Sequence, residues 1–211
     1  MKIALVAATG KIGRHIAQQA IARGHEVTAI VRRTTDVPAE LEGARLVVAA
    51  LDDHEALVAA IRGHDALASA YGPAPGDYAS LSRVADALIA AARDAGIRRL
   101  VVVGGAGSLE IAPGVQLVDT PDFPDAYKPY ALAHRDALKR FQTTDDLDWT
   151  FYSPAAEIGP GERRGQFRAQ AQALLANVEG KSEISYADYA DAFVNEIEQP
   201  RFIRQIATAA Y

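Results

Sequence analysis

Short apolar runs alternate with longer segments whose apolar residues recur every three or four positions. The runs predict strands at residues 3–6, 25–31, 45–49, 65–70 and 98–103, and the periodic segments predict helices at 11–23, 53–61 and 77–95. The run Leu100–Val103 is apolar on both faces, as strands of a parallel sheet are. The alternation therefore predicts an α/β fold, a doubly wound parallel sheet (Rossmann fold) with helices on both faces.

Residues 104–129 interrupt this alternation, because they are rich in glycine and proline and show no periodicity. A loop of this length inside a compact domain is often functional. Beyond it, the pattern predicts a helix at 130–142, a strand at 148–152, an irregular segment at 159–168, a helix from Ser185 to about Gln199 and a strand at 204–208. We expect one domain over residues 1–211, with a small substrate-side lobe mainly in 154–211.

The composition of the chain argues against several classes of protein. The chain has 211 residues, of which 49% are hydrophobic and 23% charged, with a net charge of −5, and this balance argues against nucleic-acid binding. It has no cysteine, which excludes disulfides and thiolate chemistry and fits a reducing compartment. Without a signal-peptide pattern or an apolar run of membrane-spanning length, we expect a cytoplasmic protein, monomeric or homodimeric, with no membrane partner.

The first strand runs directly into Ala7–Gly13, of sequence Ala-Ala-Thr-Gly-Lys-Ile-Gly, and then into a helix. A strand, a glycine turn and a helix N-terminus form an anion site, because backbone N–H groups and the helix dipole both favour a pyrophosphate. Gly10 would allow the tight turn, Gly13 the close packing of the helix, and Thr9 would offer a hydroxyl. Ala7 replaces the first glycine of the usual pattern and would fit there with a negative φ. The motif predicts a bound dinucleotide; the alternative is an ordinary strand-to-helix turn.

The residues after the second strand indicate which dinucleotide is bound. NAD sites usually place an acid there to bind the ribose 2′-hydroxyl, whereas this chain has Arg32–Thr35, of sequence Arg-Arg-Thr-Thr, with Asp36 beyond reach. Two guanidinium groups suit a 2′-phosphate, and Lys11 could add a further cation. A charge-assisted hydrogen bond contributes about 1.5–3 kcal/mol, so we expect NADP(H) to be preferred over NAD(H) by at least about tenfold. The alternative is that Arg32 and Arg33 are solvated surface charges.

Five segments match those of a known family in order. They are Ala-Ala-Thr-Gly-Lys-Ile-Gly at 7–13, Ile-Val-Arg at 30–32, Ser-Ala-Tyr-Gly-Pro at 69–73, Val-Val-Gly-Gly-Ala-Gly-Ser-Leu at 102–109 and Asp-Trp-Thr-Phe-Tyr-Ser-Pro at 148–154. Over nearly its whole length the chain resembles the atypical short-chain dehydrogenase/reductases of the NmrA-like NAD(P)-binding family. Within that family it is most similar to the branch labelled NADH-flavin reductase, which is related to biliverdin reductase B.

The resemblance implies roles for residues that follow the strands. The pyrophosphate would be held by Thr9, Gly10, Lys11, Ile12 and Gly13, and the 2′-phosphate by Arg32, with Arg33 beside it. The adenine would be bordered by Leu51 and Asp52, the central ribose region by Ser69, Ala70, Tyr71 and Gly72, and the nicotinamide amide by Pro154 and Ala155. Gly104 and Gly105 end the fifth strand, where the superfamily has its catalytic serine, and are also expected to border the cofactor. The chain departs from the family at Ala49-Ala50, where Gly-Asp is common.

Typical members of the superfamily use a Ser–Tyr–Lys set, in which the lysine lowers the pKa of the tyrosine. Here Tyr130 is followed one helical turn later by His134, which stands at the lysine position. The serine nearest to the end of the fifth strand is Ser108, so the set is incomplete. These three residues are the catalytic candidates. Either His134 donates or orders a proton, directly or through Tyr130, or it packs on a helix face and caps a backbone group.

An incomplete acid set still permits hydride transfer to acceptors that can take their proton from water. Such a reductase needs a stacking surface beside the nicotinamide, and the loop aromatics are Tyr71, Phe123, Tyr127 and Phe167. An anionic tail of the acceptor could be held by Arg163, Arg164 and Arg168.

Three functional hypotheses follow from these residues. The first is an NADPH-dependent reductase of a flavin, quinone or similar conjugated acceptor. The second is a non-catalytic NADP(H)-binding redox sensor that acts through a protein partner. A sugar-nucleotide isomerase or epimerase is less favoured, because the Tyr–Lys pair is missing and little chain follows Ser153. No histidines show metal-ligand spacing, so no metal is expected.

Overall fold

The computed structural model describes all 211 residues. The strands of the main sheet are β1 (Lys2–Val6), β2 (Glu26–Val31), β3 (Arg45–Val48), β4 (Ala66–Ser69), β5 (Arg99–Val103), β8 (Asp148–Ser153), β10 (Arg168–Ala171) and β12 (Gln205–Ala210). The helices are α1 (Lys11–Ala22), α2 (His54–Ile61), α3 (Ser80–Ala95), α4 (Lys128–Gln142) and α5 (Tyr186–Glu198). None of them combines the length and the apolar character that a membrane crossing requires.

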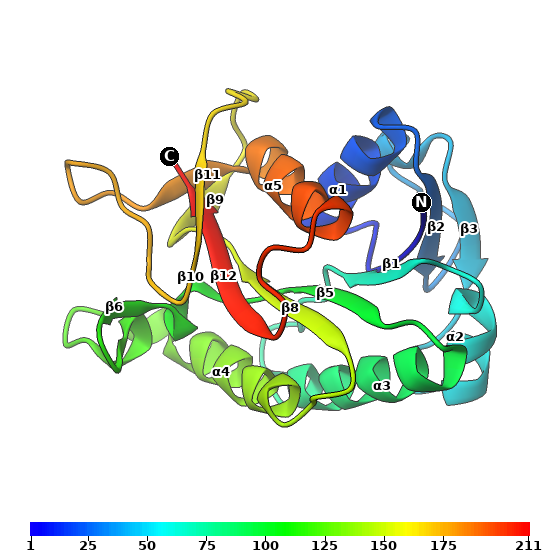
Figure 1. The fold of residues 1–211 in the computed structure, drawn as a ribbon, viewed down its shortest axis with the longest axis horizontal. Helices are drawn as coiled ribbons and strands as arrows, with labels where there is room; N and C mark the ends of the chain where they lie inside the picture. Colours follow the sequence, from blue (N-terminus) through cyan, green and yellow to red (C-terminus); the bar gives the residue numbers. More distant parts are fainter.

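The main sheet has the order β10-β12-β8-β5-β4-β1-β2-β3 (Figure 1). All neighbouring strands pair in parallel except β10, which runs antiparallel to β12. The order of the strands along the chain reverses between β1 and β4, which is the switch point where ligands bind in open α/β sheets. This topology confirms the predicted doubly wound parallel sheet.

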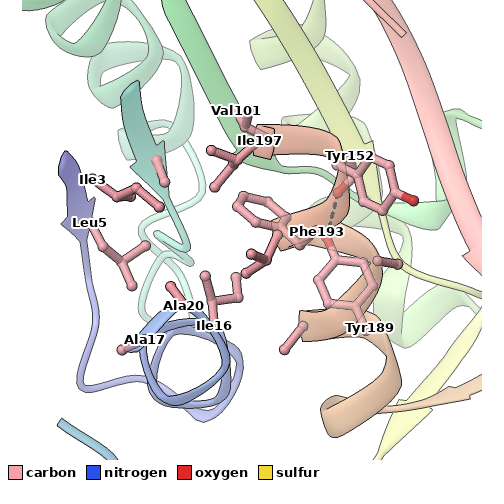
Figure 2. Close-up of a cluster of buried hydrophobic side chains, with 14 of the residues drawn as sticks. Ile3, Leu5, Ile16, Ala17, Ala20, Val101, Tyr152, Tyr189, Phe193 and Ile197 are labelled. Carbon is pink, nitrogen blue, oxygen red and sulfur yellow. Dashed lines mark hydrogen bonds between the residues drawn. The ribbon is translucent and has the colours of Figure 1, made fainter. Parts of the chain in front are cut away.

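Helices cover both faces of the sheet: α1 and α5 lie side by side on one face, and α2, α3 and α4 lie on the other (Figure 1). Alternate residues of one strand enter different cores, since successive side chains point to opposite faces. Ile3 and Leu5 of β1 pack into the core under α1 and α5, while Ala4 and Val6 pack into the other. Figure 2 shows the first core, where the Tyr189 hydroxyl donates to the Tyr152 carbonyl oxygen at 2.5 Å.

The segment predicted to be irregular after the fifth strand is ordered. It contains the hairpin strands β6 (Glu110–Ala112) and β7 (Val115–Gln116), which pair antiparallel, and three short 3-10 helices, at Ala106–Ser108, Leu117–Asp119 and Asp125–Tyr127. A fourth 3-10 helix, Ala39–Leu41, precedes β3. Periodicity could not reveal elements this short.

Three strands after β8 were not predicted. Two of them, β9 (Glu157–Gly159) and β11 (Glu183–Ser185), form a separate parallel pair, and β10 obtains its hydrogen bonds from β12. Each is three or four residues long, too short to show an alternating pattern. The helix predicted to begin at residue 77 begins at Ser80, whose hydroxyl donates to the Asp77 carbonyl oxygen at 2.6 Å within the preceding turn.

A buried ion pair ties the last helix to the centre of the sheet. The Arg99 guanidinium donates to Glu196 Oε1 at 2.8 Å and to Thr150 Oγ1 at 2.9 Å, and both charged side chains are buried. Glu196 also accepts from the backbone N–H groups of Arg201 and Phe202, each at 3.1 Å. The carboxylate therefore joins α5, β5, β8 and the chain before β12.

Replacing Glu196 by Gln should lower the free energy of unfolding by about 3–5 kcal/mol, because it leaves the buried Arg99 charge uncompensated. Urea denaturation measures this change. Asp136→Asn is the control, since it breaks an exposed pair with Lys139 and should cost less than about 1 kcal/mol. Equal losses in the two variants would contradict the central role of the buried pair.

Candidate functional site

The turn after β1 is tightly folded. Ala7 has φ +57°, and its carbonyl oxygen accepts the N–H of Gly10 at 3.1 Å. The expectation of a negative φ at Ala7 was wrong, because the chain must reverse within three residues between buried Val6 and the start of α1. A residue other than glycine in this left-handed region costs roughly 1–2 kcal/mol.

Gly13 allows α1 to approach this turn. A Cβ atom at residue 13 would lie 2.3 Å from the Ala7 carbonyl oxygen and 3.0 Å from Ala8 Cα, so only glycine fits. At Gly10 the corresponding distance to the Ala7 oxygen is 3.4 Å, an ordinary contact. The close approach that the motif predicts for Gly13 is therefore present.

The amino end of α1 has no side-chain cap and no acidic residue in its first turn. Its first backbone N–H groups and its dipole are consequently left for an anion from outside the chain. Thr9 and Lys11 are exposed at this turn, and Ile12 is half-buried. These features fit a pyrophosphate, which the backbone donors would hold without a dedicated cationic side chain.

The residues expected around the adenosine lie after β2 and β3. Arg32 is exposed and has no ion pair or hydrogen bond within the chain. Arg33 is also exposed and lies 3.9 Å from the Asp36 carboxylate. Leu51 is half-buried and Asp52 is exposed, and both lie in the turn between β3 and α2. Among the residues expected around the adenosine, Arg32 is thus a cation with no counter-ion of its own.

The end of β4 meets the start of α4. A Cβ atom at Gly72 would lie 3.3 Å from the Tyr130 hydroxyl, so glycine lets that hydroxyl come close to the backbone. Ser69 is buried and its hydroxyl accepts the N–H of Tyr71 at 3.3 Å, while Ala70 is half-buried. The Tyr71 hydroxyl donates to Ser80 Oγ at 2.9 Å, which fastens this ring to α3.

Gly104 and Gly105 follow β5, and aromatic rings pack directly against their backbone. A Cβ atom at Gly104 would lie 2.3 Å from the Phe151 ring, and one at Gly105 would lie 2.8 Å from the His134 ring. The Ser153 hydroxyl donates to the Gly105 carbonyl oxygen at 3.0 Å and so holds the ends of β5 and β8 together. Ser153 was not predicted to be a site residue, and the one signal for it in the sequence is its place before Pro154 at a strand end. Pro154 and Ala155 are buried.

His134 is only 1% exposed, and its ring lies 4.6 Å from the Tyr130 ring, centroid to centroid. Neither ring nitrogen has a hydrogen-bond partner in the chain, so the predicted backbone cap is not formed. Burial lowers the pKa of His134 to about 4, so the ring is neutral at pH 7. The structure brings Tyr130 and His134 together but leaves the histidine enclosed.

Ser108 lies in the 3-10 helix that packs on α4, where a Cβ atom at Gly107 would lie 2.7 Å from the Ala131 side chain. Its hydroxyl is buried and has no hydrogen-bond partner, so nothing in the chain links it to Tyr130 or His134. The three catalytic candidates therefore do not form a hydrogen-bonded set.

The arginines expected to hold an anionic tail are occupied. Arg163 pairs with Asp191, Nε to Oδ2 at 2.7 Å, and the Arg164 guanidinium lies 3.8 Å from the centroid of the Tyr211 ring. Arg168 donates to the carbonyl oxygens of Ala176 and Tyr211, both at 2.7 Å. Intramolecular partners thus explain all three side chains.

Three of the four aromatic residues expected to stack are half-buried, and the first of them, Tyr71, packs against the core under α2, α3 and α4. Phe123 and Phe167 are half-buried, and Phe167 packs against the core under α1 and α5. Tyr127 is 66% exposed and Tyr130 36% exposed, at the start of α4. The accessible aromatic surface therefore belongs to the segment that leads into α4.

His134 should make stability depend on pH. Its folded pKa of about 4 lies below the unfolded value of about 6.5, so the unfolded chain binds more protons between these values. The stability is complete above about pH 6.5 and falls by about 2–3 kcal/mol as the pH drops to about 4.5. His134→Leu should remove this part of the fall in urea denaturation at the two pH values. The same fall in wild type and variant would contradict the assignment.

Comparisons with known proteins agree with this geometry. The model of a family described as NAD(P)H-binding matches residues 7–200. The uncharacterised protein YwnB of Bacillus subtilis is 42% identical over 203 residues, covering 95% of this chain and 93% of YwnB.

Solved structures share the whole fold. A candidate exported protein from Burkholderia pseudomallei has a TM-score of 0.93 and 55% identity, with 100% of both chains covered. A candidate NADH-flavin reductase from Streptococcus pneumoniae has a TM-score of 0.90 and 37% identity, covering 100% of this chain and 99% of that one. A candidate epimerase from Bacteroides thetaiotaomicron has a TM-score of 0.92 and 34% identity, covering 100% and 96%. The chain belongs to the NAD(P)H-binding family of Rossmann-fold proteins.

Proposed function

We propose that this protein is an NADPH-dependent reductase that transfers hydride to a flavin, a quinone or a similar conjugated acceptor. The observation that carries the proposal is the state of His134 beside Tyr130. The histidine is buried and neutral at pH 7, so it cannot act as the cation that supports an acid–base tyrosine. An acceptor whose reduced form takes its proton from water does not need that cation.

The cofactor would be bound by groups that the chain leaves unpaired. The first N–H groups of α1 and the Thr9 hydroxyl would hold the pyrophosphate, and Arg32 would bind the 2′-phosphate. Lys11 and Arg33 would add positive charge at the same edge. When bound, the reduced nicotinamide supplies the hydride, and a proton completes the reduction of the acceptor. The buried Pro154 and Ala155 would keep water away from the nicotinamide amide.

The acceptor would pack against the start of α4. Tyr127 and Tyr130 stand three residues apart and both are partly exposed, so they offer aromatic faces to a planar ring. Desolvation raises the pKa of the Tyr130 hydroxyl above its ordinary value, which keeps it protonated at neutral pH. It can therefore donate a hydrogen bond to an acceptor oxygen, and it is a weak candidate for a base.

That property argues against the epimerase alternative. Oxidation of a sugar alcohol needs a group that removes the hydroxyl proton, which in the superfamily is a tyrosine with a lowered pKa. In this chain the neighbouring residue is His134, which is neutral at pH 7, and the pKa of Tyr130 is raised.

The redox-sensor alternative uses the same cofactor residues and differs only in the absence of turnover.

The first test measures NADPH and NADH oxidation with FMN, riboflavin and a short quinone as acceptors. Arg32→Ala should raise the KM for NADPH by at least about tenfold and leave that for NADH nearly unchanged, because it removes a charge-assisted hydrogen bond. Arg62→Ala is the control, an arginine at the end of α2 on the opposite edge of the sheet. Equal constants for the two cofactors would contradict the NADPH preference. NADPH binding without oxidation of any acceptor would favour the sensor.

Tyr130→Phe tests whether a protein acid is needed. If the acceptor takes its proton from water, kcat should fall by less than about tenfold, whereas loss of a required general acid typically costs about 10²–10⁴. Turnover is followed with the acceptor that gives the highest rate. A loss of 10² or more would assign the proton transfer to Tyr130 and contradict this part of the proposal.

A further inference from the structure

Arg14 is the residue that directly follows Gly13 in α1, and the site described above does not use it. Its Nε atom is buried and has no hydrogen-bond partner, although the side chain as a whole is 36% exposed. The charged group near it is the Glu40 carboxylate, 3.6 Å from Nε, beyond hydrogen-bond distance. The chain thus leaves the Nε atom of a guanidinium beside the turn after β1 without a hydrogen-bond partner.

Glu40 comes from the segment that follows Arg32. Residues 32–38 lead from the end of β2 to the 3-10 helix Ala39–Leu41, and Leu41 packs in the same core as Ile16 and Ala17 of α1. The Arg14–Glu40 pair therefore joins the first turn of α1 to the connection that begins with Arg32. In Rossmann folds the pyrophosphate lies at the start of this helix and the adenosine ribose at the end of the second strand.

We propose that Arg14 and Glu40 together set the affinity of this site for the 2′-phosphate. Arg14 would attract the phosphate, and Glu40 would oppose it. A phosphate carries more charge than a carboxylate, and its oxygens match the planar guanidinium fork, so it can draw Arg14 from a pair that lacks a hydrogen bond. The inference rests on the proposed preference for NADPH and names a residue pair that adjusts it.

A purely structural tether predicts something different. If the pair only held the 3-10 helix against α1, breaking it from either side would have the same effect on the site. If the pair acts through charge, removing Arg14 weakens binding of the 2′-phosphate and removing Glu40 strengthens it. The sign of the two effects separates the explanations.

The experiment measures dissociation constants by calorimetry for NADPH, NADH, adenosine 2′,5′-bisphosphate and ADP. Arg14→Gln should raise the dissociation constants of NADPH and the bisphosphate by about fivefold or more. Glu40→Gln should lower both dissociation constants by about twofold or more. The dissociation constants of NADH and ADP, which lack the 2′-phosphate, should change by less than about twofold in either variant. Arg93→Gln is the matched control, an arginine of similar exposure that pairs with Asp146 at the far end of α3.

Each outcome is decisive. If the two variants shift the dissociation constants in opposite directions, and only for the two 2′-phosphorylated ligands, the pair is supported as a determinant of specificity. Equal shifts in the same direction for all four ligands would overturn it and leave a structural tether. If Arg32→Ala abolishes the preference while both pair variants keep the wild-type ratio, only this inference fails. If wild type itself binds NADPH and NADH equally, the proposed preference fails as well.

Discussion

Burial of the central strands on both faces is the constraint on which the rest of the structure depends. The side chains of β1 and β5 enter two different cores, so helices must cover each face, and every parallel connection must cross over the sheet. This arrangement brings the carboxyl ends of β1, β2, β3, β4, β5 and β8 to one edge. The candidate site is the set of turns that results, and no separate substrate domain is needed to form it.

At that edge, the backbone of glycine residues makes close contacts that side chains would otherwise prevent. Gly13 lets α1 contact the turn after β1, and Gly104 and Gly105 let the Phe151 and His134 rings pack on the chain after β5. The strained Ala7 belongs to the same arrangement, since its carbonyl oxygen accepts a hydrogen bond within the turn. Close packing thus brings backbone atoms, and not side chains, to the contacts between the elements at this edge.

Packing also decides the chemistry of the Tyr130–His134 pair. A solvated histidine at the superfamily's lysine position could carry a positive charge, but Gly105 and Phe151 enclose the ring and burial lowers its pKa to about 4. The same desolvation keeps Tyr130 protonated. In the proposed reductase, Tyr130 and His134 would therefore offer the acceptor a neutral, partly apolar surface and no charged acid–base group.

The sequence by itself determined the α/β class, the strands up to β5 together with β8 and β12, and the five helices. It also determined Gly13 as the point where α1 approaches β1, because periodicity and a glycine at a tight contact are local properties. It also indicated Arg32, whose exposed position after β2 follows from where the strand ends. Only the tertiary structure decided the positive φ of Ala7, the partners of Arg163, Arg164 and Arg168, the burial of His134 and the Arg14–Glu40 pair. Each of these depends on residues distant in the chain, and pairing and desolvation across such distances leave no periodic signal in the sequence.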